Sequence, residues 1–208
     1  MDSTHFSLLY TVYSIPNMVL PILGGVFLDK IGVRLGLIIF SFILTLGQLV
    51  FTLGGYHNNY DMMIAGRVIF GMGGESMGVA QSAVVSSWFK GKELAFALGI
   101  NLSIARIGSV LNSVIVPSVY ETQGLGPALA IGFFVCCFAF CNSLGLSYID
   151  RKAEEANPKT ELAVISEEEK FKWSDLYSFN ISFWLLTASC VITYMSIFPF
   201  IQVASDLL

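Results

Sequence analysis

Apolar residues dominate six long stretches of the chain, and polar residues gather in the segments between them. The apolar stretches run over about residues 6–28, 35–55, 62–88, 94–119, 125–148 and from 179 to near the C-terminus. Each provides the roughly 20 residues that a helix needs to cross a bilayer. Because lipid offers no hydrogen bonds to the backbone, each span must be helical. The pattern therefore predicts an all-α, polytopic membrane protein with six transmembrane helices in a lipid bilayer.

The composition agrees with a membrane protein and excludes several classes of function. Charged residues make up 12% of the chain and hydrophobic residues 55%, whereas a soluble domain has about 25% charged residues. No basic surface suited to nucleic acid is present in the sequence. The spans hold no metal-ligand cluster, no phosphate-binding glycine loop and no constellation of His, Asp and Ser. We therefore expect no enzyme activity, no cofactor, no metal site and no nucleic-acid partner.

The basic residues predict how the spans are oriented. Nine of the eleven Lys and Arg residues lie in the segments after the first, third and fifth spans, and the segments after the second and fourth spans hold none. By the positive-inside rule, the first group of segments is cytosolic, and the N-terminal arm is luminal or extracellular. The nine basic residues are Lys30, Arg34, Lys90, Lys92, Arg151, Lys152, Lys159, Lys170 and Lys172.

One long polar segment divides the chain. Residues 149–178 are rich in Glu and Lys and contain Asn157-Pro158, unlike the apolar spans on either side. Runs of mixed charge usually keep a chain in water. We therefore predict a helical bundle at 1–148, a cytosolic central linker at 149–178 and the first helix of a second, truncated bundle at 179–208.

Two charged residues inside the spans are the strongest candidates for function. Gly91 lies in the short loop between the third and fourth spans. Glu75 precedes Gly91 by sixteen residues, and Arg106 follows it by fifteen. At ~1.5 Å per residue, both lie near mid-membrane at similar depth. They either form an ion pair or bind opposite ends of one ligand, and a zwitterion fits the second case. Because intramembrane charges usually mark a substrate or ion path, Glu75 and Arg106 are predicted to bind substrate.

Other residues are predicted to support this cavity. Arg67 lies eight residues before Glu75, which places it about 12 Å nearer the lumen. Asn112 and Tyr13 are polar residues of the fourth and first spans and are expected to line the same space. The glycines of the third span fit the small-xxx-small pattern and are predicted to serve mainly close helix packing.

The first cytosolic turn carries glycine and charged residues at a recognisable spacing. It is similar to the signature loop that joins the second and third helices of the major facilitator superfamily. In that family the loop clamps and releases the two halves of the protein, so the resemblance implies a conformational role rather than substrate contact. The matching positions are Gly25, Asp29, Lys30, Gly32 and Arg34.

A second resemblance lies in the third span. Arg67 followed by Gly71 and Gly73 resembles the motif in the fourth helix of the same family. The two matches agree with each other: if the first span corresponds to the family's second helix, the third span corresponds to its fourth. The resemblance implies that the chain covers helices two to seven of twelve, and therefore part of a major facilitator superfamily bundle.

Longer runs resemble a lysosomal branch of this family. They cover residues 71–76, 86–93 and 101–112. The resemblance implies a multi-pass lysosomal membrane protein whose full-length parent is a uniporter. It would export dipeptides, notably cationic ones, from lumen to cytosol by alternating access, with Glu75 and Arg106 as the substrate-binding acid and base. It also implies a homodimer and a glycosylated lysosomal membrane accessory protein.

Two other readings of the sequence stay open. A proton-coupled symporter of a small zwitterionic or organic-anion metabolite is one, since Glu75 would titrate if burial outweighed the attraction of Arg106. A non-transporting truncated isoform or scaffold is the other. Transport in this family needs two opposing bundles around a central site, so the 208-residue chain alone is expected not to transport.

Overall fold

The structure is a computed structural model that describes residue 20 and residues 23–156 and 180–207. Tyr13 and all but the first residues of the predicted linker lie outside this part of the chain. The chain divides into two compact units, Met1–Glu168 and Glu169–Leu208. The described residues are helical with short connections, which confirms the all-α prediction.

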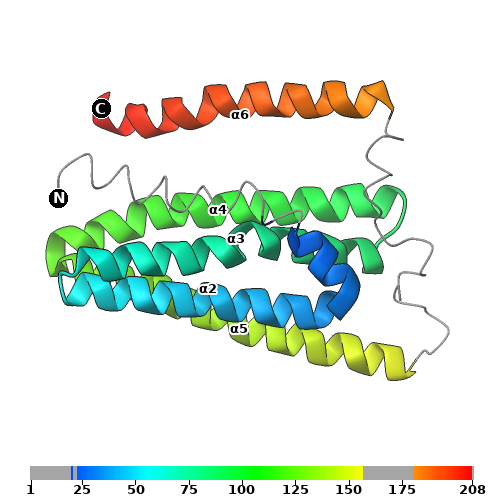
Figure 1. Cartoon of the computed structure of the whole chain (residues 1–208), viewed down its shortest axis with the longest axis horizontal. Coiled ribbons are helices and arrows are strands. Elements are labelled where there is room, and N and C mark those ends of the chain that lie inside the picture. The colour runs from blue at the N-terminus through cyan, green and yellow to red at the C-terminus, as the bar shows by residue number, and fades with distance from the viewer. Residues whose placement is uncertain (1–19, 21–22, 157–179, 208) are drawn as a thin grey trace. The chain divides into compact units, whose positions relative to one another are not determined.

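The first unit contains a short helix at 23–31 and four long helices (Figure 1). The long helices are α2 (Val33–Tyr56), α3 (Tyr60–Trp88), α4 (Lys92–Gln123) and α5 (Leu125–Ala156). Helix α2 packs against both α3 and α5, and α4 contacts α5 and, less extensively, α3. The second unit contains α6 (Ile181–Leu207).

Tight turns join the long helices and make successive helices antiparallel neighbours. Gly91 precedes α4 with a φ of 60°, and Gly124 separates α4 from α5 with a φ of 89°. Backbone in this region is strained for residues with a Cβ, so glycine suits both positions. At the start of α3, the Asn59 side chain accepts a hydrogen bond of 3.2 Å from the Met62 amide and caps the helix.

Three of the described helices are long and apolar enough to cross a membrane, namely α2, α4 and α5. Within α6, the apolar stretch Ile181–Ser196 is shorter. Helix α3 has the length, but Asp61, Arg67, Glu75 and its glycines reduce its mean hydropathy. Helix α3, which carries Glu75 and Arg67, is therefore not among the described helices that are apolar enough to span, whereas Arg106 lies on α4, which is. Helix α5 also continues to Ala156, beyond the predicted end of its span at residue 148.

The backbones of α2 and α3 lie in direct contact. A Cβ atom added to Gly47 would lie 2.5 Å from the Phe70 amide nitrogen, and one added to Gly66 would lie 2.5 Å from that of Phe51. Such distances require glycine, because real Cβ atoms do not approach a backbone so closely. The predicted packing role is confirmed for Gly66 and Gly73 of the third span, but not for Gly78, where a Cβ would meet nothing within 4 Å among the described residues.

Polar side chains join α2 to α5. The Thr45 hydroxyl donates a hydrogen bond of 3.2 Å to the Cys136 carbonyl. The Gln48 amide and the Thr52 hydroxyl both donate to the Leu129 carbonyl, at 3.3 Å and 3.2 Å. These residues share one stripe of α2, and hydrogen bonds between helices hold such segments together in lipid. Helix α2 is therefore fixed on both sides, and it sets the positions of α3 and α5.

Candidate functional site

Glu75 lies on a face of α3 that is open in the described part of the chain. Its side chain is exposed, as are Met72 and Gly78, one turn away on either side. The next two residues, Ser76 and Met77, are buried. Because helical residues three or four apart share a face, the burial pattern shows that α3 packs on one side and presents Glu75 on the other.

Arg106 lies on α4, of which no residue is buried. Asn112 is likewise exposed, about two turns further along the helix. Within the described part of the chain, no ion pair joins Glu75 to Arg106. The sequence allowed either an ion pair between Glu75 and Arg106 or binding of one ligand by both. The described structure shows no such ion pair.

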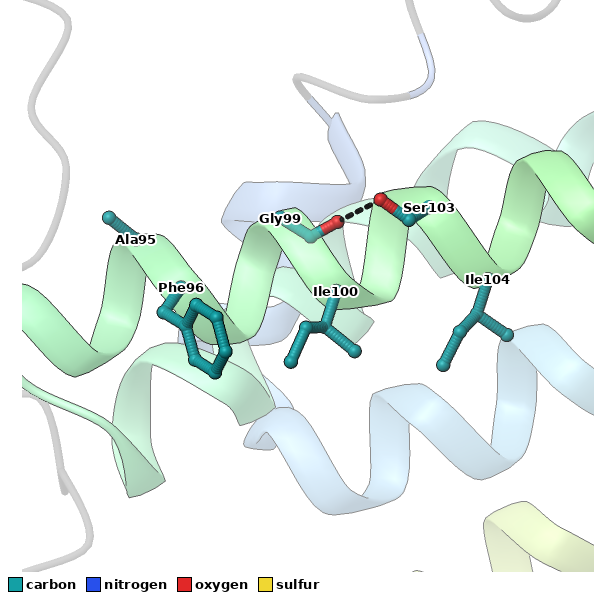
Figure 2. A pocket seen from close by; sticks show the side chains of 6 residues that line it. All are labelled: Ala95, Phe96, Gly99, Ile100, Ser103 and Ile104. Carbon is teal, nitrogen blue, oxygen red and sulfur yellow. Dashed lines mark hydrogen bonds between the residues drawn. The ribbon is translucent and has the colours of Figure 1, made fainter.

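An open groove lies on the cytosolic half of α4, with a volume of about 380 Å³ (Figure 2). Among the described residues that line it, only Ser103 has a polar side chain, which donates a hydrogen bond of 2.9 Å to the Gly99 carbonyl. Ser103 precedes Arg106 by about one turn, so the groove begins next to the arginine on the cytosolic side. The residues that line it are Ala95, Phe96, Gly99, Ile100, Ser103 and Ile104.

Arg67 lies in the contact between α3 and α2. Its guanidinium carbon is 4.0 Å from the centroid of the Phe51 ring and 5.9 Å from that of the Phe70 ring. A guanidinium over an aromatic face at this distance gains a cation–π attraction. Arg67 is therefore held by aromatic rings of the α2–α3 interface, whereas Glu75 and Arg106 stay exposed.

The structure shows why the signature loop contains some of its residues. Gly32 lies between the helix at 23–31 and α2 and has a φ of 91°, a conformation that favours glycine. Asp29 is half-buried and Lys30 is exposed. Gly25 makes no close contact with a facing helix, because a Cβ there would meet nothing within 4 Å among the described residues. Its neighbour Gly24 makes that contact, because its Cβ would lie 2.6 Å from the Ser76 hydroxyl of α3.

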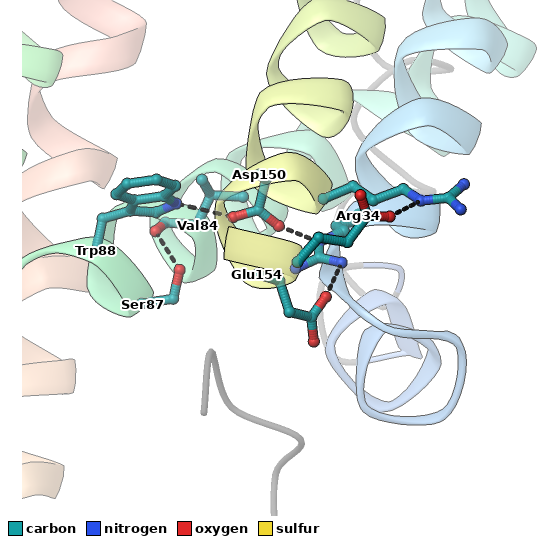
Figure 3. Close-up of polar contacts among 8 residues, drawn as sticks. Arg34, Val84, Ser87, Trp88, Asp150 and Glu154 are labelled. Atoms are coloured by element: carbon teal, nitrogen blue, oxygen red, sulfur yellow. Dashed lines mark hydrogen bonds and ion pairs between the residues drawn. The ribbon is translucent and has the colours of Figure 1, made fainter. Parts of the chain in front are cut away.

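Arg34, the last residue of the signature loop, belongs to a cluster of charged and polar side chains (Figure 3). Its Nε atom forms an ion pair with Asp150, and its Nη1 atom lies 2.5 Å from Glu154. The Trp88 indole donates a hydrogen bond of 3.0 Å to the other oxygen of Asp150. We call these four residues the cytosolic cluster, because they lie at the ends of α2, α3 and α5 that the positive-inside rule places in the cytosol.

The sequence did not reveal the role of Asp150, Glu154 and Trp88. Residues from 149 onward read as a solvated linker because their charges are dense and of mixed sign. The usable signal was the spacing of Asp150 and Glu154, which share one helix face four residues apart. Their partner Arg34 lies 116 residues from Asp150 and 120 residues from Glu154 in the chain, so only the packing of α2 against α5 reveals these contacts.

Comparisons with known proteins agree with the resemblances in the sequence. The family model described as Major Facilitator Superfamily matches residues 1–207. Proteins of cattle and mouse named lysosomal dipeptide transporter MFSD1 are each 41% identical to the chain, and the human protein of that name is 40% identical. Each match covers 97% of this chain and 45% of the relative. The chain thus spans about half the length of the curated relatives it matches.

Proposed function

Because the chain belongs to the major facilitator superfamily, a family of membrane transporters rather than enzymes, we propose that it forms the N-terminal part of a full-length dipeptide transporter. The observation that carries the proposal is the pair of exposed charges, Glu75 on α3 and Arg106 on α4, with no ion pair between them in the described part of the chain. Charges kept at membrane depth at such cost usually serve a substrate.

A dipeptide has the chemistry that these two side chains would recognise. Its free amino group pairs with the Glu75 carboxylate, and its carboxylate accepts a bidentate hydrogen bond from the Arg106 guanidinium. The relatives in cattle, mouse and human are named as dipeptide transporters. Arg67 and Asn112 would support this site, together with Tyr13, which lies outside the described residues.

The transport cycle that we propose is uniport by alternating access. Two bundles rock around a central site and expose it first to the lumen and then to the cytosol. Asp29, Lys30 and Arg34 of the signature loop serve this conformational change and do not contact substrate. Dipeptides, notably cationic ones, would then leave the lysosome down their concentration gradient.

The setting of the protein is part of the same proposal. The names of the relatives support a multi-pass protein of the lysosomal membrane. The distribution of basic residues supports a luminal N-terminal arm and a cytosolic segment at 149–178. The resemblance adds a homodimer and a glycosylated lysosomal membrane accessory protein as partners.

The test uses the full-length transporter, purified and reconstituted in liposomes. Lysylalanine binding is measured by thermal stabilisation, and its flux is measured across the membrane. Glu75→Gln and Arg106→Lys should each weaken binding by about 10- to 100-fold, the equivalent of losing a charge-assisted hydrogen bond. Glu121→Gln, an exposed acid near the end of α4, serves as the control and should bind normally. Normal binding by both site variants would refute the proposed site.

Proton-coupled symport is the second candidate, because a carboxylate kept at membrane depth, like the exposed Glu75, marks an ion path as readily as a substrate site. Flux with and without an imposed pH gradient separates the two mechanisms. A uniporter brings substrate only to equal concentrations on both sides. Accumulation that occurs only with the gradient would establish the symporter of a zwitterionic or organic-anion metabolite instead.

A non-transporting isoform is tested by reconstituting the 208-residue chain beside the full-length transporter. We expect the chain alone to give background flux, because alternating access needs two bundles. Equal dipeptide flux in both preparations would show that this expectation is wrong.

A further inference from the structure

Asp150, on α5, has a buried carboxylate that binds side chains of two other helices. Only 8% of its surface is exposed, and a buried charge is tolerated only when it is paired and hydrogen-bonded. Arg34, at the start of α2, provides the charge. Trp88, at the end of α3, provides a neutral hydrogen bond of 3.0 Å to the second oxygen. The two oxygens of one α5 side chain thus bind two different helices.

The two acidic partners of Arg34, Asp150 and Glu154, differ in how exposed they are. Glu154 also binds Arg34, but its side chain is 45% exposed, whereas that of Asp150 is 12% exposed. Water therefore competes for Glu154 far more than for Asp150. Arg34 itself is 31% exposed. Asp150 is consequently the residue that fixes the direction of the Arg34 side chain.

Trp88 connects this cluster to the helix of the candidate substrate site. It follows Glu75 by thirteen residues on α3, which is about 20 Å along one continuous helix. A shift or rotation of α3 would move both ends together, because packed helices move as rigid elements. The indole is therefore placed to pass a movement at Glu75 to Asp150, and through Asp150 to the signature loop.

We propose that Asp150 is a positioning residue of the signature loop, and that Trp88 couples its hold on Arg34 to the position of α3. This inference rests on the proposed function, since it assigns the movement of the loop to a transport cycle. Asp150 and Trp88 do not touch substrate. They set the orientation of Arg34 and the rate at which the loop changes its state.

The predicted signature is a change of transport rate without a change of substrate binding. Asp150→Asn keeps the shape of the side chain and removes its charge, and Trp88→Phe keeps an aromatic ring and removes the indole N–H. In the full-length transporter we expect Asp150→Asn to change the maximal rate of lysylalanine flux about fivefold, within the usual range of coupling between sites. Trp88→Phe should change it in the same direction by about twofold. Lysylalanine binding, measured by thermal stabilisation, should stay within about twofold for both variants.

The double variant tests whether the two residues act together. If Trp88 acts through Asp150, adding Trp88→Phe to Asp150→Asn should change the rate no further. Additive effects would overturn the coupling through Asp150. The control is Arg151→Gln, because Arg151 and Glu155 form an exposed ion pair within α5, next to Asp150 in sequence. A similar rate change in Arg151→Gln would indicate a general effect of charge and would contradict the proposal.

A labelling experiment reports the loop directly and does not depend on flux. Lys30→Cys places a thiol at an exposed position of the signature loop, and its maleimide reaction rate is measured with and without lysylalanine. We expect the dipeptide to change the rate in the Lys30→Cys protein, and Trp88→Phe to reduce that change by at least about twofold. An unaltered response in the Trp88→Phe variant would overturn the link through α3.

Glu75→Gln in the same assays separates the two proposals. If Glu75→Gln abolishes dipeptide binding and Asp150→Asn leaves the flux unchanged, only the positioning role is wrong. If Glu75→Gln and Arg106→Lys both bind the dipeptide normally, the proposed substrate site is wrong. The labelling of Lys30→Cys with and without Asp150→Asn would then still test, in the absence of dipeptide, whether Asp150 holds the loop.

Discussion

The cytosolic cluster and the faces around Glu75 and Arg106 contain the same chemistry in opposite arrangements. At the cytosolic ends of the helices, Arg34 is paired with Asp150 and Glu154. Near the middle of α3 and α4, an acid and an arginine are both exposed, and no ion pair joins them in the part of the chain that the structure describes. The first arrangement binds helices to one another, and the second leaves its charges available to the ligand that we propose.

The cost of each arrangement depends on depth in the membrane. A charge near the bilayer surface is partly hydrated, so the cluster has a modest desolvation cost and gains a defined geometry. A charge at mid-membrane costs several times more unless it meets water or a partner. Helix α3 also contains packing glycines and Arg67, which lowers its mean hydropathy. A paired charge in this protein therefore marks a structural contact, whereas an exposed charge at membrane depth is the candidate for a ligand site.

The largest expected effect comes from breaking the scaffold that holds both regions. Gly66→Leu would force a side chain into the Phe51 backbone of α2, and we expect it to lower the free energy of unfolding by about 3 kcal/mol or more. Gly78→Leu is the matched control, because a Cβ there meets nothing within 4 Å among the described residues. Thermal unfolding of the full-length protein without ligand measures both. Equal destabilisation would show that Gly78 is also a packing position.

The next effect separates the two regions by reversing one charge in each. Asp150→Lys places two positive charges together beside Arg34. We expect a loss of about 2 kcal/mol, below the roughly 3–5 kcal/mol of a fully buried pair because Arg34 is partly exposed. Glu75→Lys should leave the unfolding temperature nearly unchanged while abolishing dipeptide binding. The comparison fails if Glu75→Lys unfolds the protein as readily as Asp150→Lys.

A smaller effect is expected at Arg67, which belongs with the paired charges although it lies within α3. Arg67→Met keeps much of the side-chain volume and removes the cation over the Phe51 ring. The expected loss is about 1 kcal/mol of folding stability, typical of a cation–π contact. Phe51→Leu combined with Arg67→Met forms a double-mutant cycle with thermal unfolding as the readout. A coupling energy near zero would remove Arg67 from this group.

The smallest effect is expected at the surface of α5. Arg151 and Glu155 pair at 3.1 Å, but both side chains are more than half exposed. Arg151→Gln should therefore cost less than about 0.5 kcal/mol, as for other exposed pairs four residues apart on a helix. Unfolding temperatures of Arg151→Gln and wild-type protein compared in low and high salt provide the measurement. A larger loss that salt does not reduce would mean that the pair has a buried role.

The sequence predicted the helices and identified Glu75 and Arg106 as charges within spans because both follow from local pattern, but it left open whether the two residues pair. Hydrophobic length defined the spans, and counting from Gly91 placed Glu75 and Arg106 at similar depth. It did not predict Asp150, whose partner Arg34 lies on α2 and becomes a neighbour only when α2 packs on α5. The sequence pattern also could not distinguish Gly66, which packs against α2, from the exposed Gly78. That difference depends on which residues of α3 contact α2.

The division between paired and exposed charges also explains the end of α5. The high density of charged residues after residue 148 predicts a linker, yet helix α5 continues to Ala156. Asp150 and Glu154 face α2 in this extension, whereas Arg151 and Lys152 are exposed. The four-residue spacing of Asp150 and Glu154 is typical of one helix face, but composition alone does not reveal that this face contacts α2.

The most direct test is the thermal unfolding of full-length Glu75→Gln with and without lysylalanine. We predict that the unfolding temperature of this variant without ligand matches that of the wild-type protein, because Glu75 forms no ion pair with Arg106 in the described structure. We also predict that lysylalanine stabilises the variant far less than the wild-type protein at the same concentration, because the carboxylate proposed to bind the amino group is gone. A variant that is destabilised without ligand but still stabilised normally by the dipeptide would contradict both predictions, and would make Glu75 a structural charge like Asp150.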